Sequence, residues 1–362
     1  CAMPCRSSLV RGGGRVTRTY LDHNATAPLR AEAKEAMVAA MDIVGNPSSV
    51  HSEGRAAKAL LEKSRQQIAE ALGAGNADLV FVSGATEAAA LACAGRTLQG
   101  APIEHDAVGA WLDMSIPVDA NGIVTVDDPV NSCLQLANSE TGVIQTLPNG
   151  LAVSDVTQGF GRIPFAYSWA GVEMVFASAH KIGGPKGVGV LVIPQGHDLK
   201  AQLLGGGQEM GRRAGTENLV GIAGFAAAAV AGQKDLADGR WDEVAELRNL
   251  LEARIADASK DTIFVGNAVT RLPNTSCYVT RGWKGETQVM AMDLAGFAIS
   301  AGSACSSGKV KASRVLQAMG LDEVEAASAT RISLGLETTK AEVLAYADAW
   351  ADRYKKMRAR AA

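Results

Sequence analysis

Short apolar runs alternate with helix-like segments along most of this chain, and this alternation constrains the fold more than any other feature. The clearest unit is Asp-Leu-Val-Phe-Val-Ser at 78–83, which is typical of a buried strand and leads through Gly84 into an alanine-rich helix. Further strands are expected at 132–137, 151–154, 174–177 and 187–193, and helices at 31–43 and 52–72. The alternation favours an α/β domain with a mostly parallel sheet and functional residues after the strands' carboxyl ends.

A long charged helix expected at 236–258 leads to a second set of elements. Strands are expected there at 262–265, 275–280, 298–300 and 330–333, and helices at 286–293, 313–319 and 340–357. We therefore predict a large domain at 20–245 and a smaller α+β domain at 246–362, with residues 20–29 packing against the small domain. Residues 1–19 contain four arginines and a Gly-Gly-Gly run, and we interpret them as a disordered leader, with a targeting peptide as the alternative.

The composition excludes several classes of function. The 362 residues are 47% hydrophobic and carry a net charge of −3, so there is no basic excess to neutralise phosphates and we expect no direct nucleic-acid partner. The longest apolar run, 219–232, is shorter than the roughly 20 residues of a membrane crossing and predicts a buried helix, with no membrane partner. Six scattered cysteines without a CxxC pair indicate the reducing cytoplasm.

Three motifs after predicted strands carry the chemistry. Lys181 follows an apolar strand within a run of small residues and glycines, and by itself it could be a surface residue of a tight loop. Asp155 ends another strand, where a carboxylate can keep a pyridine nitrogen protonated. The Gly84 turn opens a helix whose free backbone N–H groups suit a phosphate. A lysine, an aspartate and a phosphate site together indicate pyridoxal 5'-phosphate (PLP).

The order of the motifs resembles the cysteine desulfurases, class V members of the fold-type I PLP enzymes. The likeness runs from about Tyr20 to the C-terminus. It rests on nine motifs in family order: Tyr20–Pro28, Gly45–His51, Ser83–Glu87, Glu104-His105, Asn138–Gly142, Asp155–Gln158, His180-Lys181, Arg213–Thr216 and Gly302–Cys305. The resemblance implies a large PLP-binding domain with a mostly parallel sheet, a smaller α+β domain, and a homodimer.

The resemblance also implies a role for individual residues. Lys181 is expected to form the Schiff base with PLP and later to move the α-proton of the substrate, because burial and a cationic neighbour lower the pKa of a lysine. His105 is expected to stack on the pyridine ring and to act in proton transfer, although a histidine after a short loop is by itself more often structural. Asp155 would bind the ring nitrogen and Gln158 the phenolic oxygen. The expected phosphate ligands are Ala85, Thr86, Ser178, His180 and, from the neighbouring subunit, Thr216.

Two further residues are expected to handle the substrate. Cys305 lies in a run of small residues that cannot pack as a core element, and the resemblance implies that its thiol accepts the sulfur as a persulfide, although a random loop cysteine is more often inert. Arg331 lies in a predicted strand and could be a merely exposed residue. The resemblance makes it the bidentate clamp for the substrate carboxylate.

The chain departs from the family pattern in two ways. Ser139 stands where the family has an asparagine that contacts both the cofactor oxygen and the substrate carboxylate, and a hydroxyl cannot offer the same paired geometry. The intervals from Thr86 to His105, from His105 to Asn138 and from Asn138 to Asp155 are shorter than in the family, which predicts a trimmed periphery of the large domain. We expect the catalytic positions to survive this trimming.

The resulting hypothesis is a PLP-dependent cysteine desulfurase that converts L-cysteine to L-alanine and loads sulfur on Cys305. The small residues around Cys305 resemble the long-loop subgroup, which delivers sulfur to an iron–sulfur scaffold protein or to a tRNA-thiolation relay. One alternative is a lyase of the same family that acts on selenocysteine or cysteine sulfinate. Another is a non-catalytic interaction subunit, which the retained Lys181 and Arg331 disfavour. An ordinary aminotransferase is disfavoured because it has no use for the cysteine loop.

Overall fold

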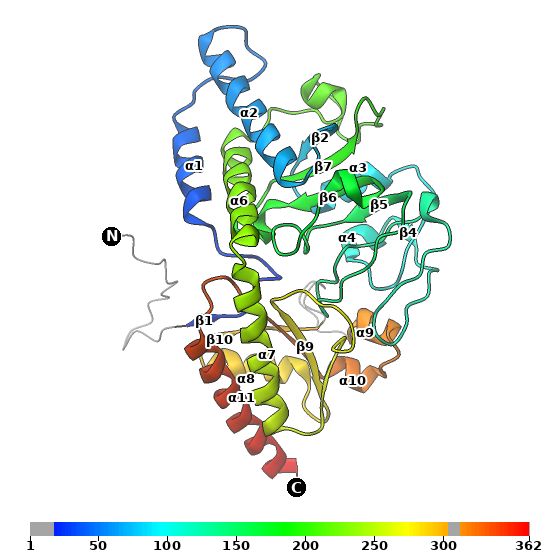
Figure 1. Ribbon diagram of the computed structural model, residues 1–362, viewed down its shortest axis with the longest axis vertical. Coiled ribbons are helices and arrows are strands. Elements are labelled where there is room, and N and C mark those ends of the chain that lie inside the picture. The colour runs from blue at the N-terminus through cyan, green and yellow to red at the C-terminus, as the bar shows by residue number, and fades with distance from the viewer. Residues whose placement is uncertain (1–17, 303–311, 362) are drawn as a thin grey trace.

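The computed structural model describes residues 18–302 and 312–361 and divides into two halves joined by a long helix, α7 (Figure 1). The larger half contains a four-stranded sheet in the order β2-β7-β6-β5. These strands are β2 (Ala77–Val82), β7 (Gly189–Pro194), β6 (Val172–Ser178) and β5 (Leu151–Asp155). Strands β5 and β6 are parallel, whereas β7 is antiparallel to both of its neighbours. The expected common direction therefore holds for β2, β6 and β5, and β7 runs the opposite way.

Helices cover both faces of this sheet, as the α/β prediction requires. On β6, Val175 and Ala177 belong to the apolar cluster that includes residues of α2 and α6, whereas Met174 and Phe176 belong to the cluster of α3. The helices of this half are α1 (Ala31–Met41), α2 (Ser52–Ala71), α3 (Ala85–Cys93), α4 (Asp106–Gly109), α5 (Tyr167–Ala170) and α6 (Leu219–Ala237). The result is a three-layer domain.

Helix α6 is long and apolar enough to cross a membrane by those two measures alone. It packs against α1 and α2, however, and most of its apolar residues are buried, including Ile222 and Phe225. We conclude that α6 is a core helix of the large half, as the run at 219–232 predicted.

The run predicted as a strand at 132–137 is extended but forms no continuous strand. Ser132 and Cys133 make isolated parallel bridges to Gln99 and to Val153, and the N–H groups of Leu134 and Leu136 donate to Val153 and Asp155 of β5. On the other side of the run the backbone N–H of Gln135 donates to the Glu104 carboxyl instead of to a neighbouring strand. Beyond this run lies a separate two-stranded sheet of β3 (Leu98–Gln99) and β4 (Leu112–Asp113). The trimming of the large domain relative to the family stays a prediction.

The smaller half contains a four-stranded antiparallel sheet in the order β11-β12-β9-β8. Its strands are β8 (Thr262–Phe264), β9 (Thr275–Thr280), β11 (Ser300–Ala301) and β12 (Ala329–Ser333). Its helices are α7 (Arg240–Ala258), α8 (Gly285–Leu294), α9 (Arg314–Ala318), α10 (Glu323–Ala327) and α11 (Lys340–Ala361). A separate aromatic core with Tyr278, Tyr346 and Trp350 fixes α11 on the sheet. The predicted boundary at 245 falls inside α7 and stays a prediction.

The N-terminal segment, residues 19–26, joins the two halves. Its strand β1 (Thr19–Tyr20) pairs in parallel with β10 (Phe297–Ala298). The strand predicted at 298–300 is therefore split, because Phe297–Ala298 pair with β1 while Ser300–Ala301 pair with β12. After β1 the segment continues to the carboxyl end of β6, where the Ala27 N–H donates to the carbonyl group of His180.

Candidate active site

Lys181 is the last residue of a short 3₁₀ turn, η2 (Ala179–Lys181), which follows directly after β6. Its Nζ donates to the backbone carbonyl oxygens of Asn24 and Ala25, at 2.6 and 3.0 Å. The turn is tight because Gly184 packs on Ala179, where an added Cβ would come within 2.9 Å of the alanine Cβ. The lysine amine is thus held by the N-terminal segment, at the carboxyl end of a buried strand.

Asn24 is fully buried and connects the lysine to the rest of the site. Its backbone carbonyl also accepts from Gln158 Nε2 at 3.1 Å, and its side-chain oxygen accepts from Arg162 at 3.0 Å. Its amide nitrogen donates to the carbonyl oxygen of Ser139 at 3.1 Å and to Thr275 Oγ1 at 2.9 Å. One asparagine therefore bonds to residues of both halves of the molecule.

Gln158 and Arg162 form a buried pair next to Lys181. The Arg162 guanidinium donates to the Gln158 side-chain oxygen and, at 2.9 Å, to the backbone carbonyl of Lys181. Burial, and then the nearby Arg331, lower the pKa of Arg162 to about 9. The hydrogen bond from Arg162 orients the Gln158 amide beside Lys181. The sequence predicted at this position a donor for a cofactor oxygen.

Asp155 ends β5, the strand that is parallel to β6, so the aspartate and Lys181 follow the same edge of the sheet. Its Oδ1 accepts from the Thr157 N–H at 2.8 Å, while the buried Thr157 hydroxyl has no partner within the described part of the chain. Glu104 lies close enough for the Asp155 charge to act on it. Burial raises the pKa of Glu104 to about 8; a hydrogen bond from Gln135 lowers it and Asp155 raises it further.

The turn before α3 is an open helix N-terminus. Gly84 is the N-cap residue, and with no side chain it leaves the first N–H groups of α3 uncapped. The turn lies against β7, because a Cβ on Gly189 would come within 2.8 Å of Gly84 Cα. An ideal Cβ on Gly84 would in turn lie 3.7 Å from Ser178 Oγ. Ala85 starts α3 and Thr86 is exposed in its first turn, so four of the predicted phosphate residues share one region with the end of β6.

His180 lies between this helix terminus and the N-terminal segment. Its Nδ1 is 3.2 Å from Thr26 Oγ1. Burial lowers the pKa of His180 to about 4, with further lowering by Lys181, Lys186 and Arg162. The imidazole is therefore neutral at pH 7 and can offer one N–H to a ligand.

These residues fit PLP. An amine, a carboxylate and an amide follow the ends of neighbouring strands, and an uncapped helix N-terminus provides an anion site beside Ser178. The unpartnered Thr157 hydroxyl beside Asp155 is a further polar group that a ligand would satisfy. The donor set is that of the prediction, although the role of each residue stays a prediction.

Arg331 is buried on β12 and belongs to the same site through Ser139. Its NH1 donates to the carbonyl oxygen of Ser139 at 3.0 Å, and its NH2 forms an ion pair with Asp22 at 2.7 Å. The structure thus brings Arg331 and Ser139 together, by way of the serine backbone. Arg331 Nε is buried and has no partner among the described residues.

His105 caps α4, where its Nδ1 accepts from the Ala107 N–H at 3.1 Å. The small half holds this turn in place, because Arg314 of α9 donates to the carbonyl oxygen of Glu104 at 2.7 Å and pairs with Asp106 at 3.1 Å. His105 is half-buried, directly after the buried Glu104. The structure therefore gives it a local structural role, which is compatible with the predicted ring contact.

Cys305 lies outside the described residues, within 303–311. The flanking residues on both sides are close to one carboxyl group, that of Glu140. Ser313 Oγ donates to Glu140 Oε2 at 2.5 Å, and a Cβ on Gly302 would lie 3.5 Å from the same oxygen. Burial raises the pKa of Glu140 to about 7, while the Ser313 hydrogen bond, Arg331 and Arg314 lower it.

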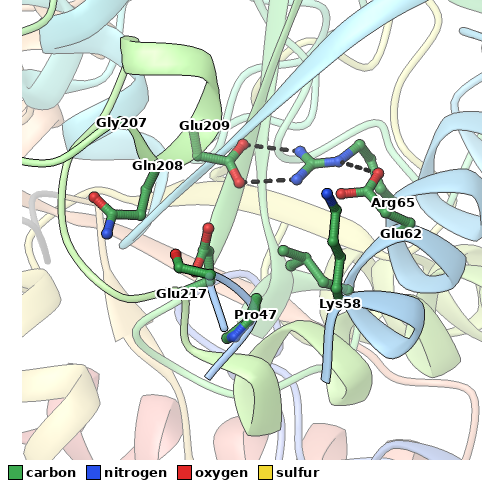
Figure 2. Close-up of a pocket in the computed structure, with 10 residues that line it drawn as sticks. Pro47, Lys58, Glu62, Arg65, Gly207, Gln208, Glu209 and Glu217 are labelled. Atoms are coloured by element: carbon green, nitrogen blue, oxygen red, sulfur yellow. Dashed lines mark hydrogen bonds and ion pairs between the residues drawn. The ribbon is translucent and has the colours of Figure 1, made fainter. Parts of the chain in front are cut away.

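Thr216 is exposed on a loop that precedes α6. Nearby, Glu209 accepts two hydrogen bonds from Arg65 and one from the Phe81 N–H, at 2.8 to 2.9 Å (Figure 2). These contacts hold Glu209 and Met210 in left-handed backbone conformations, with φ of 49° and 56°. The pocket beside them, about 330 Å³, is lined by charged residues that include Lys58 and Glu217. The structure does not bring Thr216 to Lys181 within one chain.

The sequence reading assigned no role to Asp22, Asn24, Arg162 or Glu140. A signal existed for the first two, because both lie in the Tyr20–Pro28 motif, and for Glu140, which lies in the Asn138–Gly142 motif. Arg162 could have been noticed four residues after Gln158. Their partners are more than a hundred residues distant along the chain in most cases, so the contacts themselves could not be read from local patterns.

Comparison with known proteins agrees with this geometry. The family model described as aminotransferase class-V matches residues 19–108 and 128–346. The cysteine desulfurase of Cereibacter sphaeroides is 36% identical over 365 residues, covering 90% of this chain and 93% of that protein. The NifS-like protein of Rickettsia africae has a similar structure, with a TM-score of 0.84, 30% identity, and coverage of 93% and 99% of the two chains. A structure of SspA in complex with cysteine matches with a TM-score of 0.72 and 25% identity, covering 89% and 100%.

The chain belongs to the class V aminotransferase family, and the NifS-like protein shares its fold. Within that family it is a cysteine desulfurase, and hence an enzyme, as the motif order predicted. The segment that the family model leaves unmatched, 109–127, falls in the interval between His105 and Asn138, one of the three predicted to be short.

Proposed function

We propose that this enzyme uses PLP bound to Lys181 to convert L-cysteine to L-alanine, and that Cys305 accepts the sulfur atom as a persulfide. The observation that carries the proposal is the Asn24-centred network, which joins the Lys181 amine to Gln158 and, through Ser139, to Arg331. A reactive amine and a carboxylate-binding guanidinium thus belong to one buried cluster. The cysteine found bound to the related SspA supports the choice of substrate.

PLP, when bound, supplies an electron sink for the bonds at the α-carbon of an amino acid. We assign its phosphate to Ala85, Thr86, Ser178 and His180, its ring nitrogen to Asp155, and its phenolic oxygen to Gln158. The neutral His180 would donate to the phosphate while Thr26 fixes its ring. Thr157 orients Asp155 through its backbone N–H, which leaves the second carboxylate oxygen for the ring.

Lys181 is the group that we expect to move the α-proton. In the described structure its Nζ donates to two backbone carbonyl oxygens, those of Asn24 and Ala25, which hold the amine at the carboxyl end of β6. Arg331 would bind the substrate carboxylate. The thiolate of Cys305 would attack the substrate Sγ, so that an S–S bond forms as the Cβ–Sγ bond breaks, and Cβ would keep the electron pair and gain a proton to give the methyl group of alanine.

We further propose a homodimer in which Thr216 contributes to the phosphate site of the partner subunit. Two segments that meet at the pocket of Figure 2 carry exposed apolar side chains. Val44 and Val50 are 92% and 88% exposed, and Leu204 and Met210 are 86% and 72% exposed. Such a group of apolar side chains is costly in water and suits an interface. Arg213, paired with Glu87 of α3, would connect this face to the phosphate site.

We also propose that the persulfide supplies an iron–sulfur scaffold or a thiolation acceptor in the cytoplasm. The described cysteines support a reducing compartment, because Cys93, Cys133 and Cys277 are buried and free.

The test is an L-cysteine assay with the PLP-loaded protein, in which alanine and sulfide are measured together in the presence of a thiol reductant. Equal molar yields are expected, and Cys305→Ala is expected to abolish sulfide release from L-cysteine. Sulfide without alanine would contradict the proposed reaction. If Cys305→Ala retained the wild-type rate, the persulfide role would be excluded and the lyase alternative favoured.

A further inference from the structure

Arg331, the residue assigned to the substrate carboxylate, already holds a carboxylate of its own chain. Its NH2 forms an ion pair with Asp22 Oδ1 at 2.7 Å, with the arginine side chain 3% and the aspartate side chain 17% exposed. Its NH1 donates to the carbonyl oxygen of Ser139 at 3.0 Å. The positive charge is therefore compensated before a ligand arrives.

Asp22 is held in this position by other contacts. Its second carboxylate oxygen accepts from Ser300 Oγ at 2.9 Å, and Ser300 is the residue opposite Arg331 in the β11–β12 ladder. Its backbone makes a parallel bridge to Ser333, two residues after Arg331. Because both oxygens are engaged with neighbours on one sheet, the ion pair is a fixed part of the site.

The Arg331 guanidinium is nevertheless incompletely satisfied. Its Nε is buried and has no partner in the described residues, and a buried donor without an acceptor is costly. A planar guanidinium can bind a carboxylate along one edge while another edge is occupied. One edge is thus taken by Asp22, and the unpartnered Nε marks where an incoming acceptor can bind.

Resting on the proposed function, we propose that Asp22 is a specificity-determining residue: an internal carboxylate that competes electrostatically with the α-carboxylate of the substrate for Arg331. Two anions on one guanidinium repel each other, so Asp22 lowers the affinity for an α-carboxylate. It also stabilises the empty site, because a buried arginine without its partner is strongly unfavourable.

The two effects have opposite signs, and this separates the proposal from a purely structural role. Removing the charge of Asp22 is expected to lower the melting temperature and, at the same time, to strengthen the binding of carboxylate ligands. If Asp22 only supported the fold, its substitution would lower both the melting temperature and the affinity for carboxylate ligands. Ligands without a carboxylate do not use Arg331, so their affinity is expected to stay the same.

The experiment uses the PLP-loaded wild type, Asp22→Asn, and Asp22→Ser as a second variant that keeps a hydroxyl acceptor. Asp293→Asn, which removes the carboxylate of the exposed pair with Arg18, is the matched control. Dissociation constants for L-alanine and for ethylamine, which lacks the carboxylate, are measured by absorbance titration, and melting temperatures by circular dichroism. For either Asp22 variant we expect a three- to tenfold lower dissociation constant for L-alanine, a change below twofold for ethylamine, and a lower melting temperature.

An unchanged or higher dissociation constant for L-alanine in a folded Asp22 variant would overturn the proposal. So would a decrease in the dissociation constant for ethylamine as large as that for L-alanine. Turnover of L-cysteine by the wild type is measured in parallel. If the wild type makes no alanine, the proposed function fails; if it does and the Asp22 variants bind L-alanine more weakly, only the role of Asp22 is refuted.

Discussion

The lysine end and the arginine end of the site are held in different ways. Lys181 donates to two neutral backbone carbonyls, whereas Arg331 is compensated by a charged side chain, Asp22. An ion pair keeps a binding group charged and in place. The N-terminal segment therefore holds the lysine through its backbone and the arginine through a side chain.

The two ends also have one buried carboxyl group each. Burial is the main cause of the raised pKa in both cases, about 8 for Glu104 and about 7 for Glu140. Asp155 raises the pKa of Glu104 further while Arg314 lowers it, and Arg331 and Arg314 lower the pKa of Glu140 while Asp106 raises it. Both carboxyl groups therefore owe their raised pKa to burial rather than to the sign of the charges around them.

The largest effect is expected at the lysine end. Lys181→Ala removes the amine, and turnover of L-cysteine should fall by at least about 1000-fold, since proton transfer by a placed side chain contributes 10²–10⁴. The visible absorbance of a lysine-bound cofactor should disappear as well. The exposed Lys186, changed to alanine, is the matched control. Retained absorbance and turnover in Lys181→Ala would show that another group holds the cofactor.

At the arginine end the loss should appear in substrate binding. Arg331→Ala is expected to raise KM for L-cysteine by about 10- to 100-fold, because hydrogen bonds to charged groups are worth about 1.5–3 kcal/mol. Steady-state kinetics measures this, with Arg281→Ala, from an exposed pair with Glu325, as the control. A normal KM would place the carboxylate elsewhere, and the contrast between the two ends would disappear.

Asn24 connects the two ends, so its loss should affect both kinetic constants moderately. Asn24→Ala leaves Arg162 and the carbonyl of Ser139 short of one partner each. We expect about a tenfold lower kcat/KM and a free energy of unfolding lower by about 1–3 kcal/mol. Kinetics and urea unfolding measure these, with the exposed Asn131→Ala as the control. An effect on KM alone would mean that the asparagine serves only the arginine end.

The last prediction concerns the effect of pH on stability rather than on turnover. Because the folded protein holds protons on Glu104 and Glu140 that the unfolded chain has lost, stability should fall as pH rises above about 4.5, up to about 7 for Glu140 and about 8 for Glu104. Glu104→Gln should reduce the loss of unfolding free energy between about pH 4.5 and pH 8, by an amount on the order of a few kcal/mol. Glu140→Gln should reduce this loss only up to about pH 7. Melting temperatures from pH 5 to 9 test this; identical profiles for both variants and the wild type would contradict it.

The sequence predicted the regular elements of the molecule better than its polar network. The strand at 275–280 and the helix beginning at 52 were predicted at their observed positions, because their apolar spacing is local. The run at 132–137 bonds to β5 on one side, but on the other side Gln135 bonds to Glu104 rather than to a strand. The reversed direction of β7 is decided by its partners rather than by its own residues. In the same way the motifs located Lys181 and Arg331, but the contacts of Asn24 and Asp22 join residues more than a hundred positions apart.

The pairing of β1 with β10 sets an order on biosynthesis. Residues 19–24 are synthesised long before their partners Phe297, Arg331 and Ser333. A nascent chain that has completed the large sheet still lacks the contacts that fix Asp22 and Asn24, and such long-range closure is slow. The enzyme therefore completes this part of its site only after residues 297–333 have been synthesised.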